Sequence, residues 1–327
     1  MISVLVTGGA GFIGSHLVER LLLLGGFQVT IVDDFNDFYS PRVKRANITK
    51  VLQRGSVDIV TASLLDSVRI QDLFESKSFD IVIHLAARAG VRPSLMDPIL
   101  YQSVNVEGTY RLLEWARNCG IKKFVFGSSS SVYGVASRVP FTEDQPLQTP
   151  ASPYAATKIA GEAACHVYSH LYGIQALCLR FFTVFGPRQR PDLAIHKFTA
   201  LMLAGEPIPL YGDGSTARDY TYVDDIVDCI VSSLTYEGKL FDIFNVGSEN
   251  PIRLDTLVEL IARVCDVEPR IQWLPTQAGD VSITWADITK ARKLLGYEPR
   301  VGREEGLRRF VDWFRTRDKI YELAHSS

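Results

Sequence analysis

The segment TGGAGFIG, Thr7–Gly14, follows the short β-branched run Ile2–Thr7 and opens a stretch with helical periodicity. Its three glycines, Gly8, Gly11 and Gly14, allow a tight turn, a close approach of the backbone to a pyrophosphate, and close packing of helix on strand. A helix that begins here points free N–H groups and a partial positive charge at a bound phosphate. A glycine-rich turn without a ligand is the alternative. The segment therefore predicts a strand–turn–helix unit suited to a dinucleotide.

Strand-like and helix-like segments alternate through the first half of the chain. The strand-like segments are nearly continuous apolar runs, as expected for a parallel sheet that is covered on both faces. They are Ile2–Thr7, Phe27–Asp33, Val57–Ala62, Asp80–Ala87, Lys122–Ser129 and Ile174–Phe182. This alternation predicts an α/β fold with a doubly wound Rossmann parallel sheet.

The composition of the sequence changes after Phe182, where glycine and proline become frequent and short predicted helices alternate with short predicted strands. We interpret residues 1–182 as a dinucleotide-binding Rossmann domain and residues 183–327 as a smaller α/β C-terminal substrate domain. A strand and a helix around residues 218–247 are candidates for a return to the main sheet. A chain of 327 residues is long enough for both domains.

The end of the second predicted strand bears on which dinucleotide binds. This strand ends at Asp33, about 20 residues beyond the glycines, where an acidic side chain accepts hydrogen bonds from the adenosine ribose. Asp34 follows, and no arginine stands immediately after it. Because two carboxylates would repel a 2′-phosphate, NAD is favoured over NADP.

Charge and composition exclude several classes of protein. The net charge of −2 gives no reason to expect nucleic acid or an anionic membrane as a partner. The five cysteines are odd in number and lack CxxC spacing, which favours a reducing compartment over disulfides or a zinc site. The six histidines show no metal-ligand spacing, so no metal is expected. With no recognisable signal peptide or membrane-spanning run, we expect a cytoplasmic protein.

Tyr154 and Lys158 stand four residues apart on a predicted helix that follows the strand ending in FGSSSSVYG, and so share one helix face. Tyrosine has an ordinary pKa of about 10, too high for a base near neutrality. A neighbouring ammonium and an oxidised nicotinamide would both lower it. A serine at the strand end would hydrogen-bond the reacting hydroxyl. YxxxK alone fits an ordinary amphipathic helix, but beside the glycine turn and the serines it predicts an acid–base catalyst.

These motifs resemble the extended short-chain dehydrogenase/reductase superfamily and, within it, the nucleotide-sugar epimerases and dehydratases. The resemblance covers nearly the whole chain. Its motifs are VTGGAGFIGSHL, HLAA, NVEGT, SSSSVYG, SPYAATK, LRFFTVFGPRQRPD, RDYTYVDD and TWADITKARKLLGYEP. It implies NAD as the cofactor, Ser129 as a catalytic partner of Tyr154 and Lys158, and nucleotide-sugar binding by residues 183–327.

The resemblance also implies the cofactor contacts. The superfamily's second cofactor carboxylate, after the third predicted strand, falls on Ser63, which is a departure. Asn105 matches a position close to the nicotinamide. The expected cofactor-binding residues are Gly8, Gly11, Phe12, Ile13, Gly14, Asp33, Asp34, Ser63, Leu64, Leu85, Ala86, Ala87, Asn105, Ser128, Tyr154, Lys158 and Phe181.

The residues after Ser129 distinguish the reactions of the superfamily. Its dehydratases carry an Asp–Glu pair there, and its decarboxylases usually carry a glutamate, whereas this chain has Ser130 and Ser131. The remaining candidate groups, Ser129, Tyr154 and Lys158, support oxidation and re-reduction at one carbon. This implies an NAD-dependent nucleotide-sugar 4-epimerase, an isomerase in which NAD stays tightly bound.

The arginine-rich segments ARAGVRPS and FFTVFGPRQRPD resemble the UDP-glucuronate 4-epimerases, which interconvert UDP-glucuronate and UDP-galacturonate. A planar guanidinium matches a carboxylate, so Arg190 is the first candidate for a clamp on C5, followed by Arg92 and Arg88. The other substrate-binding positions that the resemblance implies are Ser129, Ser130, Thr183, Arg218, Gln277 and Asp280.

Other functions stay open. A UDP-glucose or UDP-N-acetylglucosamine 4-epimerase is the first alternative, and a UDP-glucuronate decarboxylase is a further one. A binding module that kept the fold without activity is another, although intact Ser129, Tyr154 and Lys158 argue against it.

The predicted helices around Asp97–Cys119 and Ser152–Tyr172 carry apolar residues on more than one face. The resemblance implies that such helices pair into a four-helix dimer interface, while burial within the same chain is the alternative. We therefore expect a homodimer that binds a UDP-sugar.

Overall fold

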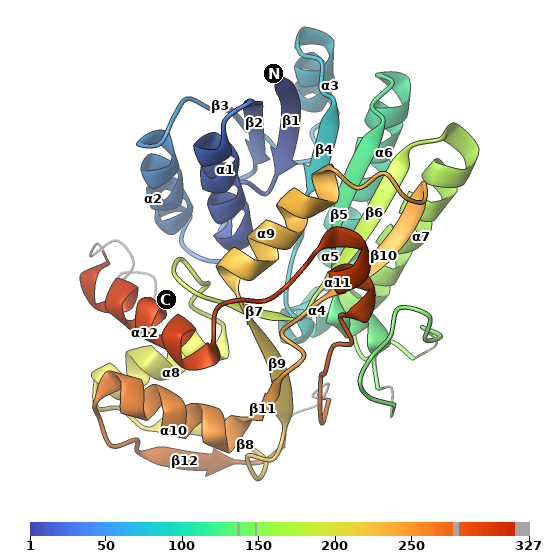
Figure 1. Cartoon of the computed structure of the whole chain (residues 1–327). Coiled ribbons are helices and arrows are strands. Elements are labelled where there is room, and N and C mark those ends of the chain that lie inside the picture. Colours follow the sequence, from blue (N-terminus) through green and yellow to red (C-terminus); the bar gives the residue numbers. More distant parts are fainter. Residues whose placement is uncertain (136–137, 148, 277–280, 318–327) are drawn as a thin grey trace.

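The computed structural model describes residues 1–135, 138–147, 149–276 and 281–317. Within them, one sheet contains seven strands, all parallel, in the order β10-β6-β5-β4-β1-β2-β3 (Figure 1). The strands are β1 (Ile2–Thr7), β2 (Phe27–Asp33), β3 (Asp58–Thr61), β4 (Ile81–His84), β5 (Lys123–Ser129), β6 (Gln175–Phe181) and β10 (Phe241–Val246). The predicted doubly wound sheet is confirmed. Because the strand order reverses between β1 and β4, a crevice opens at the carboxyl ends of these two strands.

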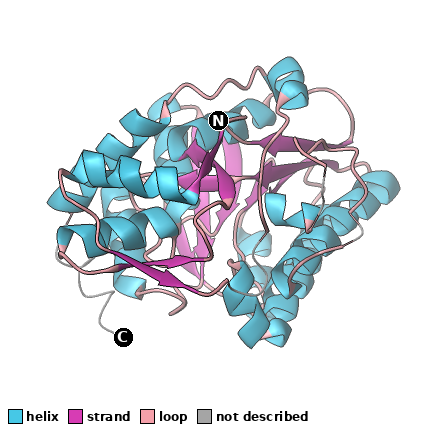
Figure 2. Ribbon diagram, turned by 90° about the horizontal axis from the view of Figure 1, so that it is seen from below, coloured by secondary structure: helices cyan, strands magenta, loops and turns pink. Residues whose placement is uncertain are grey.

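Helices cover both faces of this sheet, as Figure 2 shows. Alternate residues of a strand point to opposite faces, so Val4 and Val6 pack in one apolar core and Leu5 packs in the other. One face carries α1 (Phe12–Leu24), α2 (Pro41–Leu52) and α9 (Val223–Leu234). The other carries α3 (Ser67–Ser76), α6 (Gly108–Asn118) and α7 (Pro153–Tyr172).

Short helical segments connect β4 to α6 and follow β5. They are α4 (Val91–Met96), α5 (Pro98–Tyr101), the π-helical turn Gln102–Glu107, and the 3-10 turn Ser130–Tyr133. β4 ends at His84 rather than at the predicted Ala87, because the chain leaves the sheet there to pass over the glycine turn.

Much of the chain after Phe182 builds the lower part of Figure 1, while α9 and β10 lie with the large sheet. β11 (Pro251–Arg253), β9 (Ala217–Tyr222) and β7 (Thr183–Phe185) form one small sheet, and β12 (Ile271–Leu274) pairs with β8 (Ile208–Tyr211) in another. The helices here are α8 (Ala194–Leu203), α10 (Leu254–Cys265) and α12 (Arg303–Thr316), whereas α11 (Thr289–Leu295) lies beside β10 of the large sheet. β10 comes from beyond residue 182 and still lies beside β6 in the large sheet. The division of ligand binding at residue 182 stays a prediction.

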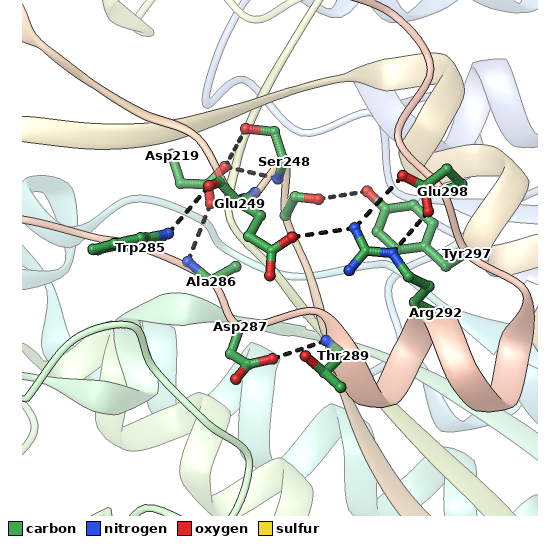
Figure 3. A network of polar contacts seen from close by, with 11 residues as sticks. Asp219, Ser248, Glu249, Trp285, Ala286, Asp287, Thr289, Arg292, Tyr297 and Glu298 are labelled. Carbon is green, nitrogen blue, oxygen red and sulfur yellow. Dashed lines mark hydrogen bonds and ion pairs between the residues drawn. The ribbon is translucent and has the colours of Figure 1, made fainter.

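A buried carboxylate joins the small sheet to the C-terminal segment (Figure 3). Asp219 accepts hydrogen bonds from the backbone N–H groups of Ser248, Glu249 and Ala286 at 2.7, 3.0 and 3.1 Å. Burial raises the pKa of Asp219, and these donors oppose the rise. The network thereby holds the strand that carries Arg218 against the segment that carries Thr284.

Among the described residues, no helix combines the length and apolar character needed to cross a membrane.

Candidate active site

A cavity of about 470 Å³ lies at the carboxyl ends of the parallel strands, where the crevice was expected. Its wall combines the glycine turn, the end of β2, the segment after β4, the end of β5, the start of α7 and the segment after β6. The predicted site residues that line it are Gly8, Gly11, Phe12, Ile13, Gly14, Asp33, Asp34, Ser63, Leu64, Leu85, Ala86, Ala87, Arg88, Ser128, Ser129, Ser130, Tyr154, Lys158, Phe181, Thr183, Arg190 and Arg218.

Two predicted site residues do not line this cavity. Asn105 is buried, and its amide accepts from the Arg88 N–H at 2.7 Å and donates to the Arg88 carbonyl at 2.9 Å. It therefore holds the segment after β4 in place, and its proximity to a cofactor stays a prediction. The Arg92 guanidinium lies over the Tyr211 ring, 5.1 Å from its centroid, and neither residue lines the cavity. Gln277 and Asp280 lie outside the described residues.

The glycine turn is shaped by close backbone approaches. Gly8 has φ +73°, and a Cβ there would lie 2.7 Å from the Ala86 nitrogen. A Cβ on Gly14 would lie 2.1 Å from the Gly8 carbonyl oxygen. Only glycine fits either position, so the N-terminus of α1 can face the cavity at short range.

Asp33 lies at the end of β2 and is held by backbone donors. Its carboxylate accepts from the Ala10 N–H at 3.0 Å and the Phe35 N–H at 2.9 Å. Burial raises the pKa of Asp33, while the charge of Lys44 and these N–H groups oppose the rise. Lys44, from α2, also lines the cavity and was missed by the sequence analysis. The sequence feature that could have indicated Lys44 is its position on the inner face of the helix that follows Asp33 and Asp34.

The start of α7 is defined by local capping. The Ser152 hydroxyl accepts from the Ala155 N–H at 3.1 Å, and Pro153 occupies the first helical position. Tyr154 is therefore presented from the first turn, where it lines the cavity. One turn later the Lys158 ammonium donates to the Gly127 carbonyl at 2.6 Å, which ties α7 to β5.

The electrostatics of the phenol differ from the sequence-based expectation. Burial raises the pKa of Tyr154, while the hydrogen bond with Ser129 and the charge of Arg190 oppose the rise. Lys158 was expected to lower it, but the Lys158 ammonium lies 5.9 Å from the Tyr154 ring centroid and donates elsewhere. Burial also lowers the pKa of Lys158 to about 8, against the charge of Glu162. Ser129 and Arg190 are thus the protein groups that favour the phenolate.

A buried ion pair between α7 and β6 was not predicted from the sequence. Glu162, one turn after Lys158, accepts from the Ser128 hydroxyl at 2.6 Å. It also receives two hydrogen bonds from Arg180, at 2.9 and 2.8 Å, and both side chains are at most 5% exposed. Since Ser128 lines the cavity and Arg180 belongs to β6, this pair fastens α7 to two strands of the sheet. Its only sequence signal was an acidic residue four positions after Lys158.

Arg190 lies in the cavity wall with its guanidinium 5.4 Å from the centroid of the Phe38 ring. Asp192 binds it in bidentate fashion. From the sequence, Arg190 was expected to be available to a ligand carboxylate, and Asp192 was not predicted as its intramolecular partner. Phe38 and the neighbouring Tyr39, aromatic residues after the acidic pair, also line the cavity and were missed.

Together these features fit a dinucleotide: a turn that admits no side chain, a helix N-terminus, and a carboxylate at the end of β2. Tyr154, Ser129 and Lys158, the residues predicted to act as an acid–base set, line the same cavity. Among the described residues, no cluster of histidine, cysteine or acidic side chains is suited to a metal ion. The fold and the site define a Rossmann-type enzyme of the short-chain dehydrogenase/reductase class.

Comparison with known proteins gives the family. Residues 4–247 match the NAD dependent epimerase/dehydratase family. A UDP-glucuronate 4-epimerase of Thermodesulfobacterium geofontis is 42% identical over 310 residues, covering 94% of this chain and 95% of its own length. The chain therefore belongs to the NAD dependent epimerase/dehydratase family, and NAD is its cofactor.

Solved structures agree with this assignment. The crystal structure of UDP-glucuronic acid 4-epimerase from Bacillus cereus in complex with UDP-glucuronic acid and NAD is similar, with a TM-score of 0.89 and 36% identity. The match covers 96% of this chain and 99% of that chain. A UDP-glucose 4-epimerase from Thermotoga maritima is similar with a TM-score of 0.88 and 33% identity, over 96% and 99% of the two chains.

Proposed function

We propose that this protein is a UDP-glucuronate 4-epimerase that interconverts UDP-glucuronate and UDP-galacturonate. The observation that carries the proposal is the position of Arg190, which lines the cavity close enough to Tyr154 for its charge to act on the phenol. A uronic acid has its carboxylate on C5, next to the C4 hydroxyl that an epimerase must deprotonate. A cation beside the catalytic tyrosine is therefore where such a carboxylate would lie. The similarity to UDP-glucuronate 4-epimerases at about 40% identity supports the same substrate.

In this proposal, Tyr154 takes the proton of the C4 hydroxyl and later returns it. Ser129, which hydrogen-bonds Tyr154, also binds the oxygen on C4 and stabilises its developing charge. Lys158 would bind the nicotinamide ribose and contributes positive charge to the cavity wall. When bound, NAD supplies the reversible hydride acceptor for C4. Arg218 pairs with the UDP diphosphate, and Thr183 leaves room for the carboxylate.

The acidic residues of the cavity favour epimerisation over dehydration. Among the described lining residues, Asp33 and Asp34 are the acids, and both lie at the β2 end. Ser130 and Ser131 occupy the positions next to Ser129. A dehydratase needs further acid–base groups beside the sugar, which these serines do not supply at neutral pH.

The direct test is conversion of UDP-glucuronate and, separately, UDP-glucose by purified protein, with products resolved chromatographically. We expect UDP-galacturonate from the first substrate at a kcat/KM at least about tenfold above that for UDP-glucose, the size of one good charge-assisted contact. A preference for UDP-glucose would reject the proposal and support the UDP-glucose 4-epimerase. That alternative has one observation in its favour, since Asp192 already balances the charge of Arg190.

We also propose that the protein is a cytoplasmic homodimer. Large apolar side chains are exposed at Met96 (87%), Ile99 (74%) and Leu171 (59%), on α4, α5 and α7. Pairing these helices with those of a second copy would bury this surface. We expect Ile99→Asp to give a monomer in light scattering at a concentration where the wild type is a dimer. A monomeric wild-type protein would contradict the proposal.

A further inference from the structure

We propose that Asp192 is a positioning residue that holds the guanidinium of Arg190 so that it presents one defined edge to the sugar carboxylate. This inference rests on the proposed function, since it concerns how the uronate would be held. It adds a residue that acts through Arg190 and need not touch the substrate itself.

The contacts between the two side chains define the orientation. Arg190 Nε lies 2.9 Å from Asp192 Oδ1, and Arg190 Nη2 lies 2.9 Å from Asp192 Oδ2. Asp192 therefore occupies the Nε side of the guanidinium, and the Phe38 ring lies 5.4 Å from Arg190 Cζ. Nη1 takes no part in the bidentate pair. The Nη1–Nη2 edge is thus the edge left for a second carboxylate.

The placement of the pair agrees with this division. Arg190 is 18% exposed and lines the cavity, whereas the Asp192 side chain is 39% exposed and does not line it. Arg190 therefore stands between Asp192 and the space beside Tyr154. Partial burial alone would raise the pKa of Asp192, but the charge of Arg190 and its hydrogen bonds hold it below its ordinary value. Asp192 is consequently ionised at neutral pH, and the pair has no net charge.

A neutral pair changes how a carboxylate is recognised. A free arginine would attract a uronate mainly by charge, while an arginine already paired offers chiefly hydrogen bonds of fixed direction. Uronate binding would then be weaker than at a free arginine, but the orientation of the carboxylate would be better defined.

Orientation matters because the oxidised sugar is a β-keto acid. When its C5–C6 bond lies parallel to the C4 carbonyl π system, that bond breaks and CO₂ leaves. The bonding electron pair moves into the C4–C5 enolate, which takes a proton from water at C5, and a 4-keto pentose results. A guanidinium in a fixed position holds the carboxylate away from this alignment. Asp192 would thus control the ratio of epimerisation to decarboxylation.

The variant Asp192→Asn tests this inference. It removes the charge and keeps the size of the side chain. We expect kcat for UDP-galacturonate formation to fall about tenfold and the pentose fraction of the product to rise about tenfold, because the clamp is misplaced. The KM for UDP-glucuronate should not rise, because a negative charge near the carboxylate has been removed. Asp192→Glu, which keeps the charge, should recover part of the wild-type ratio.

The chain contains a matched control. Arg253 and Asp255 have the same spacing and the same kind of pair, with Nη2 2.6 Å from Oδ2, but they do not line the cavity. Asp255→Asn should leave kcat, KM and the product ratio unchanged. If Asp192→Asn behaves like Asp255→Asn, the inference is wrong.

Two further measurements separate the possible failures. In the Arg190→Ala background, Asp192→Asn should have no additional effect on the product ratio, since Asp192 acts through Arg190. An equal effect in both backgrounds would overturn the positioning role. If the wild type does not convert UDP-glucuronate at all, the proposed function fails, whereas a wild-type product ratio in Asp192→Asn with an active wild type rejects only this inference.

Discussion

The buried pair Glu162–Arg180 gives a prediction whose size follows from the structure. We consider Glu162→Gln, which keeps the shape of the side chain and removes its charge. In the wild type this carboxylate receives three hydrogen bonds, one from Ser128 and two from Arg180. The variant leaves Arg180 charged, buried and facing an amide, and removing one partner of a buried ion pair costs about 3 kcal/mol or more.

We therefore expect the free energy of unfolding to fall by about 3 kcal/mol, seen as a thermal midpoint lower by roughly 6 °C. The double variant Glu162→Met/Arg180→Met should recover at least half of the loss, because neither charge is then buried. Activity should change as well. Glu162 opposes the lowering of the Lys158 pKa, so without it that pKa should fall below about 8.

The assay is thermal and urea unfolding of the single and double variants beside a surface control. Glu107→Gln removes an ion pair with Arg111 whose side chains are 50% and 39% exposed, and it should cost about 0.5 kcal/mol or less. If Glu162→Gln loses no more than this control, or if the double variant is the least stable, the reasoning about the buried pair is refuted.

Three further predictions concern the turn, two histidines and the phenol. Gly14→Ala places a Cβ 2.1 Å from the Gly8 carbonyl oxygen, so purified protein should contain no NAD when denatured and extracted; wild-type NAD content would contradict this. Burial lowers the pKa of His84 to about 3 and that of His16 to about 4. Below pH 6.5, the ordinary histidine pKa, the unfolded chain therefore binds more protons than the folded protein. The free energy of unfolding should therefore fall as pH drops from about 6.5 to about 4, by up to about 1.4 kcal/mol per pH unit for each imidazole, and a flat urea-titration profile would disprove it. Tyr154→Phe should lower kcat about a thousandfold while NAD stays bound, and turnover within tenfold of wild type would remove the phenol from the mechanism.

The sequence alone was sufficient for the sheet and for most of the cavity wall. A glycine turn between a strand and a helix is a local signal, because only residues without a side chain permit its backbone approaches. The position of Tyr154 is also encoded locally, because the N-cap Ser152 and Pro153 beside it fix the first turn of α7. Apolar runs predicted the parallel strands because both faces of such a sheet are buried.

Side-chain partners within the site could not be read from the chain in this way. Arg92 and Arg190 were both candidate clamps, but only the packing of the loops decided that Arg190 lines the cavity and Arg92 lies over Tyr211. Asn105 likewise proved to hold the Arg88 backbone.

The sequence by itself thus determined the class of fold and the chemical groups available for catalysis, because short-range geometry and periodicity encode both. The tertiary structure decided the charge environment of those groups. Glu162 meets Arg180 across 18 residues of chain, and Lys44 meets Asp33 only when α2 folds against the sheet. Burial is the largest influence on the pKa of Tyr154 and of Lys158, and it arises only when α7 packs against the sheet. Ser129 and Arg190, which also act on Tyr154, come from other segments of the chain.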